Sequence, residues 1–454
     1  MDFKKRVETC FKGNDIRCLY KKELDEDFAY KTGKAIVDYF KCKTIIVAND
    51  IRFSSPVLKQ ALIQGITEQG CNVIDIGMID TPGLYFATGF LNLPGVSITA
   101  SHNPIEYNGI KIVREMAVPV GMDSGLEKIK EIMLENKFQI SKRKGKIIEK
   151  NILDDYKEYI LSFIDPKKLK PIKVVIDAGN SIAGKIVPLV YDNLPINLIK
   201  MYFEITGYFE HHEANPLKEE NVKDLKERVV KEKADLGVAF DGDMDRVFFI
   251  DEEGKMIESS FVALAIIDYF YDEVKKSGFV YNTMMSRIIE DFAKEKKLKA
   301  IREKVGHSYI KNRMKKENAF FACEHSGHFF YKDNFYADSG IITSLIILEI
   351  YSEAKKKKRK FSELFKKYEK YSKLNEKSFK IKDKENAYEK IMNHFKEKAK
   401  KIDEFDGLGF DFGDFWIHIR FSQTEPLLRL SLEAVNEKVM KEKYDEVRKF
   451  LEGL

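Results

Sequence analysis

Apolar stretches of strand length alternate with amphipathic stretches of helical period along most of this chain. Three segments show this order, and in each the last apolar stretch runs directly into polar residues. The predicted elements are strands 44–48, 72–76 and 96–99 with helices 57–68 and 84–91, strands 173–177, 196–201 and 236–240 with helices 186–191 and 220–233, and strands 279–283, 298–302 and 319–322 after a helix at 261–271. Such alternation is typical of parallel sheets covered by helices, whose ligands lie at the carboxyl ends of the strands.

The pattern changes after the basic run Lys355–Lys360. This run is interpreted as the solvated end of a helix that begins near Gly340, where cations also favour the helix dipole; a nucleic-acid patch is the alternative. The remaining residues give a strand, a helix, two or three adjacent strands and a charged final helix, an α+β order. We therefore predict four domains, at residues 1–150, 151–252, 253–365 and 366–454. The first three are expected to have mixed, largely parallel sheets flanked by helices.

The charge balance and hydropathy restrict the partners of the chain. Among 454 residues, 78 are Lys or Arg and 73 are Asp or Glu, so the net charge is only +5. This balance does not indicate a nucleic-acid binder, and any anion site must be local. The longest apolar segments, near 261–267 and 341–348, are much shorter than the ~18 residues of a membrane span. No secretory signal is visible, so a cytoplasmic protein without membrane or nucleic-acid partners is expected.

The cysteines agree with that expectation. There are five of them, and none lies in a CxxC pair. An odd number without such spacing favours reduced thiols over a disulfide framework or a zinc site.

The loop Thr99–Pro104 follows the first predicted group of strands and contains Ser101 and His102. A hydroxyl at the end of a buried strand is well placed to react. Adjacent side chains rarely point at the same atom, however, so this dipeptide alone does not establish a catalytic pair. For the bare motif, a Ser/Asn turn is the favoured interpretation.

Three carboxylates follow the second group of strands, at Asp241, Asp243 and Asp245, and Arg246 comes next. Carboxylates this close together are costly unless a cation neutralises them. Ligands that are all oxygen favour Mg²⁺ over zinc or copper. An EF-hand is a weak alternative, because its sixth position requires glycine and Arg246 stands there. A solvated acidic turn is the remaining alternative.

The third group of strands ends in the segment Cys323–His328. Here Glu324 can accept hydrogen bonds from two sugar hydroxyls, and Ser326 can donate or accept one. His325 and His328 lack the helical i, i+4 spacing of a zinc motif. A polar turn with satisfied histidines is the competing interpretation.

The last candidate segment, 420–429, lies between two predicted strands. Arg420 and Arg429 together with Ser422 and Thr424 can form a phosphate cradle, because arginine stays charged and binds phosphate through two nitrogens. A surface network of Arg and Glu is the alternative.

Taken in chain order, these four loops resemble the signature segments of the α-D-phosphohexomutase superfamily, in its phosphomannomutase/phosphoglucomutase branch. The segments 11–17, 50–56, 107–111 and 304–307 resemble further family motifs. The resemblance implies four domains around one central cleft, one Mg²⁺ ion and a phosphoserine at Ser101. The implied activity is that of an isomerase in carbohydrate metabolism, which converts hexose 1-phosphate and hexose 6-phosphate through a hexose 1,6-bisphosphate.

The resemblance also implies roles for individual residues. Ser101, His102, Lys111 and Arg17 are expected to be catalytic, with Lys111 and His102 as candidates for general acid/base work. Metal ligands would be Ser101 and the three aspartates. Substrate contacts are expected from Arg246, Lys304, His307, Glu324, His325, Ser326, Arg420, Ser422, Gln423, Thr424 and Arg429. The chain departs from the family pattern at Asn14, Cys18, Met244, Phe421 and Gln423, which affects loop geometry more than the reaction.

The preferred hexose stays open. Glucosamine-phosphate mutases tend to carry Gln where this chain has His325, so mannose or glucose phosphates are expected, with phosphoglucosamine mutase as the alternative. A non-catalytic sugar-phosphate-binding protein or a simple phosphoserine hydrolase is a less favoured interpretation. We expect a monomer or small homo-oligomer with a small-molecule substrate.

Overall fold

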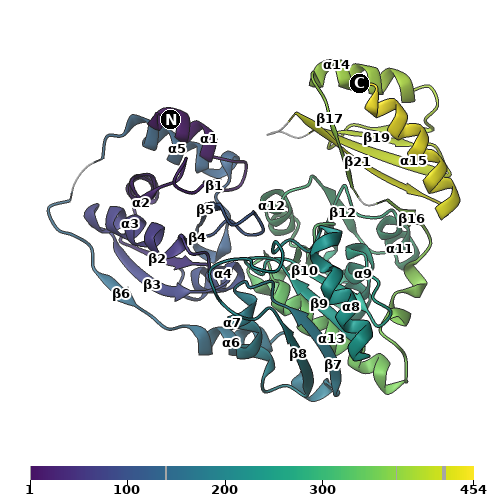
Figure 1. The fold of residues 1–454 in the computed structure, drawn as a ribbon, viewed down its shortest axis with the longest axis horizontal. Helices are drawn as coiled ribbons and strands as arrows, with labels where there is room; N and C mark the ends of the chain where they lie inside the picture. Colours follow the sequence, from purple (N-terminus) through teal and green to yellow (C-terminus); the bar gives the residue numbers. More distant parts are fainter. Residues whose placement is uncertain (1, 139–140, 375, 422–425) are drawn as a thin grey trace.

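The computed structural model describes residues 2–138, 141–374, 376–421 and 426–454, and their strands form four sheets (Figure 1). The first sheet has the order β1-β5-β4-β2-β3-β6. Its strands are β1 (Ile16–Leu19), β2 (Thr44–Asn49), β3 (Asn72–Met78), β4 (Gly95–Ile98), β5 (Tyr107–Val113) and β6 (Ile147–Glu149). The associated helices are α1 (Phe3–Cys10), α2 (Glu26–Phe40), α3 (Ser55–Glu68), α4 (Thr81–Phe90) and α5 (Leu126–Glu135).

The second sheet has the order β10-β9-β7-β8. It consists of β7 (Ile172–Asp177), β8 (Ile196–Met201), β9 (Leu236–Phe240) and β10 (Val247–Asp251), with α6 (Leu153–Leu161), α7 (Ala183–Tyr191) and α8 (Lys223–Glu232). The third sheet, in the order β12-β11-β13-β14-β15, consists of β11 (Phe279–Asn282), β12 (Ala300–Glu303), β13 (Phe321–Cys323), β14 (Phe329–Tyr331) and β15 (Ala337–Asp338). Its helices are α9 (Ser259–Tyr269), α10 (Tyr271–Ser277), α11 (Ile288–Lys296), α12 (His307–Glu317) and α13 (Gly340–Lys356).

The fourth sheet is antiparallel in all its pairings. Its strands are β16 (Ser372–Lys373), β17 (Lys377–Lys380), β18 (Lys401–Asp403), β19 (Leu408–Asp411), β20 (Phe415–Phe421) and β21 (Leu427–Ala434), and it carries α14 (Lys384–Phe395) and α15 (Glu437–Glu452). The fold is therefore three mixed α/β units followed by an α+β unit, which confirms the predicted fold class.

One topological feature is common to the first three sheets. In each, one parallel strand turns back into an antiparallel neighbour, at β4–β5, β9–β10 and β13–β14. The three predicted polar loops are these three hairpin connections. Because they leave the carboxyl ends of parallel strands, they occupy the edge of the sheet where α/β proteins place their ligands.

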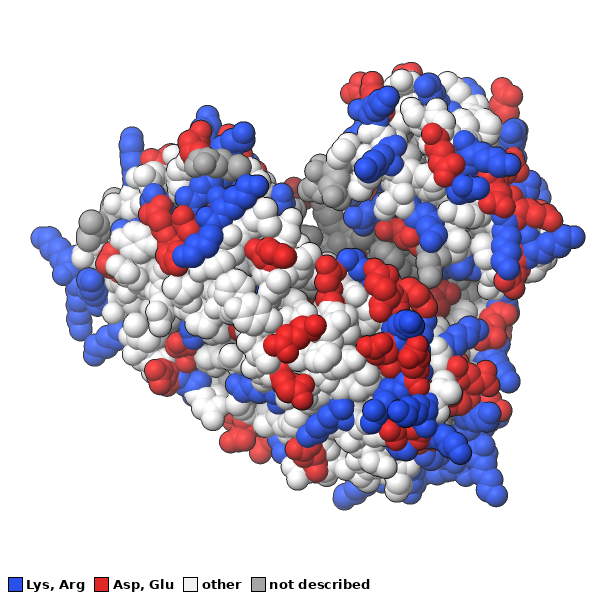
Figure 2. Space-filling model, in the orientation of Figure 1, with Lys and Arg blue, Asp and Glu red and all other residues white. Residues whose placement is uncertain are grey.

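The hydrophobic core explains how the units are held together. One cluster of buried residues runs without interruption from Ile46 in the first sheet through Val174 in the second to Leu345 on α13. The fourth sheet has its own core beneath α14 and α15, which includes Ile417 and Leu451. Figure 2 shows a deep notch between the N-terminal and C-terminal parts of the molecule, on a face where acidic and basic side chains are interspersed.

Most predicted elements are present, with shifted ends. Helix α4 begins at Thr81 instead of residue 84, because Pro82 in the first turn is compatible with a helix start. Residues Glu219–Val222 form a 3-10 turn before α8, where the sequence predicted one longer helix. No helix among the described residues is both long and apolar enough to span a membrane.

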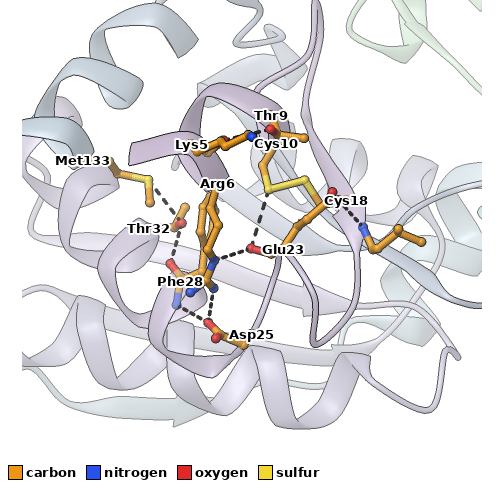
Figure 3. The surroundings of a disulfide bond; sticks show 11 residues. Lys5, Arg6, Thr9, Cys10, Cys18, Glu23, Asp25, Phe28, Thr32 and Met133 are labelled. Atoms are coloured by element: carbon orange, nitrogen blue, oxygen red, sulfur yellow. Dashed lines mark hydrogen bonds and ion pairs between the residues drawn. A yellow bond between two sulfur atoms is a disulfide. The ribbon is translucent and has the colours of Figure 1, made fainter. Parts of the chain in front are cut away.

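The prediction that all cysteines are reduced is wrong. Cys10, at the end of α1, and Cys18, in β1, form a disulfide (Figure 3). A bridge between Phe11 and Ile16 folds the chain back, so the two Cα atoms lie 5.2 Å apart. Sequence spacing alone did not reveal this turn. Cys42, Cys71 and Cys323 are free, and cysteine usage no longer supports the expected cytoplasmic location.

Candidate active site

The serine loop places a buried hydroxyl against the second sheet. Ser101 is 5% exposed, and its Oγ donates to Oδ2 of Asp241 at 3.0 Å and lies 3.0 Å from Nδ1 of His102. Burial, with Arg246 and Arg17 nearby, holds the pKa of His102 well below its usual value, so the imidazole is neutral. The structure thus brings Ser101 and His102 together, which adjacency alone did not require.

Arg52 holds the serine loop in shape, a role that the sequence analysis missed. Its guanidinium is fully buried and donates to the carbonyl oxygens of Ser101, Asn103, Pro104 and Tyr107. These four acceptors are distributed along the loop. Arg52 therefore stabilises the backbone conformation of the loop, including the left-handed φ of +50° at Ser101. In the sequence, the resemblance of segment 50–56 to a family motif was the one sign that Arg52 matters.

Arg17 reaches the serine loop from β1. Its guanidinium donates to Oδ1 of Asn103 at 2.8 Å and pairs with Asp15. The predicted cation is therefore present at the serine loop, next to the disulfide-bonded Cys18.

The metal loop gathers three carboxylates in a dry site. Asp241, Asp243 and Asp245 each offer an oxygen within 4.8 Å of the others, and all three side chains are buried. Burial raises the pKa of Asp241 to about 7, and Asp245 and Asp243 act in the same direction while Arg246 opposes them. Arg246 donates to Asp241 through both its backbone N–H and its Nε.

The donor set fits a divalent cation. Oδ1 of Asp243 and Oδ1 of Asp245 are buried and lack a hydrogen-bond partner among the described residues. Unpartnered buried carboxylate oxygens are costly, and an oxygen-binding cation removes that cost. The three aspartates are thus residues that could hold a metal such as Mg²⁺.

Lys111 and Thr81 contact the same carboxylates from the first unit. Nζ of Lys111 lies 3.1 Å from Asp243 and 2.9 Å from Asp245. Although burial opposes it, these two carboxylates hold the pKa of Lys111 well above its usual value. Thr81, which the sequence analysis missed, donates its hydroxyl to Oδ2 of Asp243 at 2.6 Å. Its position at the start of a helix gave no sign of this contact.

Gly242 allows the serine and metal loops to approach. A Cβ at this position would lie 2.2 Å from the backbone oxygen of Ser101. No side chain fits there unless one of the two backbones moves. The glycine between the first two aspartates is therefore required by the close contact between the two loops.

The sugar loop is equally ordered. Glu324 is 2% exposed, and its Oε1 accepts from the Gly306 N–H at 2.9 Å and from the Asn282 amide at 3.0 Å. Ser326 lies 2.9 Å from Nδ1 of His328. His325 is half-buried and lies near several cations. Burial has the largest effect on its pKa and, together with the charges of Lys373, Arg420, His328 and Arg429, lowers it well below the usual value.

Lys304 and His307 separate in the structure. Lys304 is exposed and lies over the ring of Phe405 in the fourth unit, with Nζ 5.7 Å from the ring centroid. His307 begins α12, and burial together with Lys311 and Lys111 lowers its pKa well below the usual value. The sequence analysis predicted substrate contacts from both residues. In the structure, Lys304 approaches the fourth unit, whereas His307 lies near Lys311 and Lys111.

The predicted phosphate clamp lies on the β20–β21 hairpin. Arg420 and Arg429 are directly opposite each other in the antiparallel pair. Like charges at such positions are destabilising unless an anion compensates them. Arg420 pairs with Asp406 at 3.3 Å and Arg429 with Glu376 at 3.4 Å. The predicted contacts Ser422, Gln423 and Thr424 lie outside the described residues.

Comparison with known proteins assigns the chain to a family. The family models of phosphoglucomutase/phosphomannomutase alpha/beta/alpha domains I, II and III match residues 8–140, 154–254 and 258–371. The chain belongs to this family. A phosphomannomutase of Vibrio cholerae is 35% identical over 98% of this chain and 99% of its own length. Phosphohexose mutases of Xanthomonas campestris are 34% identical over 98% of the chain and 99% of their own length. These relatives identify the chain as a phosphohexomutase, an isomerase.

Solved structures agree with this assignment. A phosphoglucomutase/phosphomannomutase family protein from Burkholderia thailandensis has a TM-score of 0.86 at 28% identity, covering 98% of this chain and 97% of its own. An N-acetylphosphoglucosamine mutase of Aspergillus fumigatus, solved with GlcNAc-6P and magnesium, has a TM-score of 0.61 at 12% identity and covers 99% of both chains. The latter shares the fold alone.

Proposed function

We propose that this phosphohexomutase moves a phosphoryl group between O1 and O6 of a hexose, with Ser101 as the phosphoryl carrier. The observation that supports this most directly is the contact between Ser101 Oγ and Asp241, which joins a buried nucleophile in one unit to a cluster of three carboxylates in another. Phosphoryl transfer needs positioning and charge neutralisation more than covalent help from other groups.

In the proposed reaction the bond between the phosphorus and Ser101 Oγ breaks as a bond to the free sugar hydroxyl forms, giving a hexose 1,6-bisphosphate. The proton of that hydroxyl passes to His102, whose imidazole is neutral, and Lys111, which is held in its protonated form, is the candidate to donate a proton to Ser101 Oγ as it leaves. The bisphosphate then reorients, and its other phosphate returns to Ser101. Arg246 and Arg17 supply positive charge beside the serine. When bound to the three aspartates, Mg²⁺ would neutralise charge on the phosphoryl oxygens.

We propose that Arg420 and Arg429, with Ser422, Gln423 and Thr424, bind whichever phosphate is not reacting. In this proposal Glu324, His325 and Ser326 contact the sugar hydroxyls, while Lys304 and His307 contact the sugar or its phosphate. Mannose and glucose differ only at C2, so both 1-phosphates are proposed substrates. A hexose 1,6-bisphosphate would activate the enzyme by phosphorylating Ser101. We further propose a cytoplasmic monomer or small homo-oligomer with four domains divided near residues 150, 252 and 365.

Mass spectrometry and activity assays test the proposal together. The purified protein should carry phosphate on the peptide that contains Ser101, and mannose, glucose and glucosamine 1-phosphates should be compared as substrates. Ser101→Ala should lose nearly all turnover, whereas Ser352→Ala should not. Ser352 is a buried serine on α13 whose hydroxyl, among the described residues, bonds only to its own helix and to the Lys170 N–H. Full mutase activity in Ser101→Ala would falsify the assignment. Release of free phosphate without isomerisation would instead identify a hydrolase, and preference for the amino sugar a phosphoglucosamine mutase.

A further inference from the structure

Asn282 lies beneath the sugar loop, and neither the sequence motifs nor the comparisons assign it a role. It is the last residue of β11, and its side chain is fully buried. Its amide nitrogen lies 3.0 Å from Oε1 of Glu324 and 3.1 Å from Nδ1 of His325. A single side chain thus contacts two adjacent members of the sugar loop.

The orientation of this amide is fixed by the backbone. Oδ1 of Asn282 accepts the N–H of Met284 at 3.2 Å. Since a backbone N–H can only donate, the oxygen must face Met284 and the NH₂ group must face the sugar loop. Asn282 therefore donates to both Glu324 and His325.

These donations determine what Glu324 presents. Oε1 of Glu324 accepts from Asn282 and from the Gly306 N–H. The other carboxylate oxygen, Oε2, lies 3.6 Å from Nδ1 of His328. With one oxygen held by two donors, the carboxylate cannot rotate freely, and Oε2 is left as the hydrogen-bond acceptor for a ligand.

The same amide sets the tautomer of His325. Because Nδ1 accepts a hydrogen bond from Asn282, the neutral ring must carry its own proton on Nε2. The ring stays neutral because burial and the cations Lys373, Arg420, His328 and Arg429 disfavour the imidazolium. His325 therefore presents a donor beside the acceptor of Glu324.

We propose that Asn282 is a positioning residue for sugar recognition: it fixes an acceptor on Glu324 and a donor on His325 so that the pair matches two neighbouring hydroxyls of a hexose phosphate. A hydroxyl can donate to Oε2, and its neighbour can accept from Nε2–H. This inference rests on the proposed function, since it concerns the same sugar site. Asn282 itself touches neither the sugar nor the phosphate and acts through the two residues that it orients.

The first test replaces the donor with an acceptor of the same shape. In Asn282→Asp the new carboxylate still accepts from Met284 but repels Glu324. At pH 7.5 the KM for hexose 1-phosphate should rise roughly ten- to hundredfold, because a charge-assisted hydrogen bond is lost. At pH 5.5 the two carboxylates share a proton and one again donates, so the ratio of variant to unsubstituted KM should fall several-fold. The ratio removes the pH dependence that the two proteins share, and the cations Lys373, Arg420 and Arg429 are common to both.

Asn282→Ala and Asn221→Asp are the comparison variants. Asn282→Ala removes the donor without adding a carboxylate, so its KM should rise equally at both pH values. Asn221 is another buried asparagine, whose amide donates to the Asn215 carbonyl outside the sugar loop, and Asn221→Asp should keep an unchanged KM. A merely structural role for Asn282 predicts a defect that does not vary with pH. An unchanged KM in Asn282→Asp, or a KM ratio independent of pH, would overturn the inference.

The second test requires no variant at Asn282 and no activity. Nitrogen-15 NMR of the unsubstituted protein, with the His325 signal assigned by its loss in His325→Gln, should show a neutral ring protonated at Nε2. A ring protonated at Nδ1 would overturn the inference even if the enzyme is a mutase. If the unsubstituted protein isomerises none of the three hexose phosphates, the proposed function fails while the NMR result still reports on Asn282.

Discussion

The first three units and the fourth unit differ in how deeply they bury their site residues. Ser101 and the three aspartates are buried, although the strands on either side of the serine loop pack in one core and those on either side of the metal loop in the larger core that joins the units. The clamp arginines lie on a separate core, and the side chain of Arg429 remains 42% exposed. Buried carboxylates and a buried serine are pre-organised for chemistry in a low-dielectric site. A partly exposed clamp can release one phosphate and take another, as a reorienting bisphosphate requires.

The junction between the third and fourth units differs from the junctions among the first three. Here the contacts are largely polar: Glu433 accepts from the Arg287 N–H at 2.9 Å and from the Ser286 hydroxyl, and Asp411 pairs with Arg287 at 2.7 Å. Arg302 pairs with Asp403 in the same region. Partly exposed ion pairs contribute little to stability. The two arginine pairs therefore hold the clamp unit less firmly than buried contacts hold the catalytic loops, and the buried contact of Glu433 is the stronger part of this junction.

Asp243→Asn should show the largest effect, because it changes one of the three buried carboxylates of the metal loop. Replacing one carboxylate weakens the cation site and removes charge needed to hold Lys111 in place. Turnover should fall about a hundredfold or more, and the affinity for Mg²⁺ should fall with it. Titration of the metal by calorimetry and by activity measures both. Asp251→Asn is the control, since Asp251 lies at the other end of the hairpin and accepts only from the turn at Glu253 and Lys255. An unchanged metal affinity in Asp243→Asn contradicts the assignment of the metal loop.

Gly242→Ala should have the next largest effect. The added Cβ meets the backbone of Ser101 at 2.2 Å, so the serine and the carboxylates must separate. Displacing a reacting group by about 1 Å costs on the order of a hundredfold in rate. Gly13→Ala adds a Cβ with no atom within 4 Å and should leave the rate nearly unchanged. If the two variants have equal kcat, the close approach of the loops is not needed for the reaction.

The sequence predicted the catalytic loops well because their signals are local. Strand–loop–strand patterns placed Ser101, the three aspartates and Glu324 at carboxyl ends of strands, and the hairpin connections confirm that placement. The residues that were missed act across units or from buried strand ends. Thr81 starts a helix, and Arg52 binds backbone carbonyls of a loop about 50 residues further along the chain. Nothing in a local pattern records which distant loop such side chains reach.

Asn282 shows the same limit. It ends a strand that the sequence predicted, yet its importance comes from its hydrogen bond to Glu324, which directly follows the neighbouring strand β13. Strand order decides that pairing, and periodicity does not determine strand order. The disulfide between Cys10 and Cys18 was missed for a related reason, since the turn that joins them has no distinctive spacing.

Arg429→Met tests the exposed side of the comparison. Loss of one guanidinium should raise the KM for hexose 1-phosphate about ten- to hundredfold, with a smaller change in kcat. In the unsubstituted protein, inorganic phosphate should also raise the Tm, because it relieves the repulsion between Arg420 and Arg429. That rise should shrink in the variant. Arg448→Met on α15, where Arg448 pairs with Glu452, is the control. A loss of kcat as large as that in Asp243→Asn would make the clamp part of the chemical step.

Asp406→Asn should have the smallest effect and bears on the junction itself. Asp406 accepts from the Thr283 hydroxyl at 2.7 Å and from the Val305 N–H at 3.0 Å, and it pairs with Nε of Arg420. It thus ties the clamp to the ends of β11 and β12, and it contacts Arg420 at Nε rather than at the terminal nitrogens that would bind phosphate. Without the charge, Arg420 is less well oriented, and KM should rise a few-fold while Mg²⁺ affinity stays the same. The exposed Asp414→Asn should match the unsubstituted protein. A lower KM in Asp406→Asn would show instead that Asp406 competes with phosphate for Arg420, and the junction would then oppose binding.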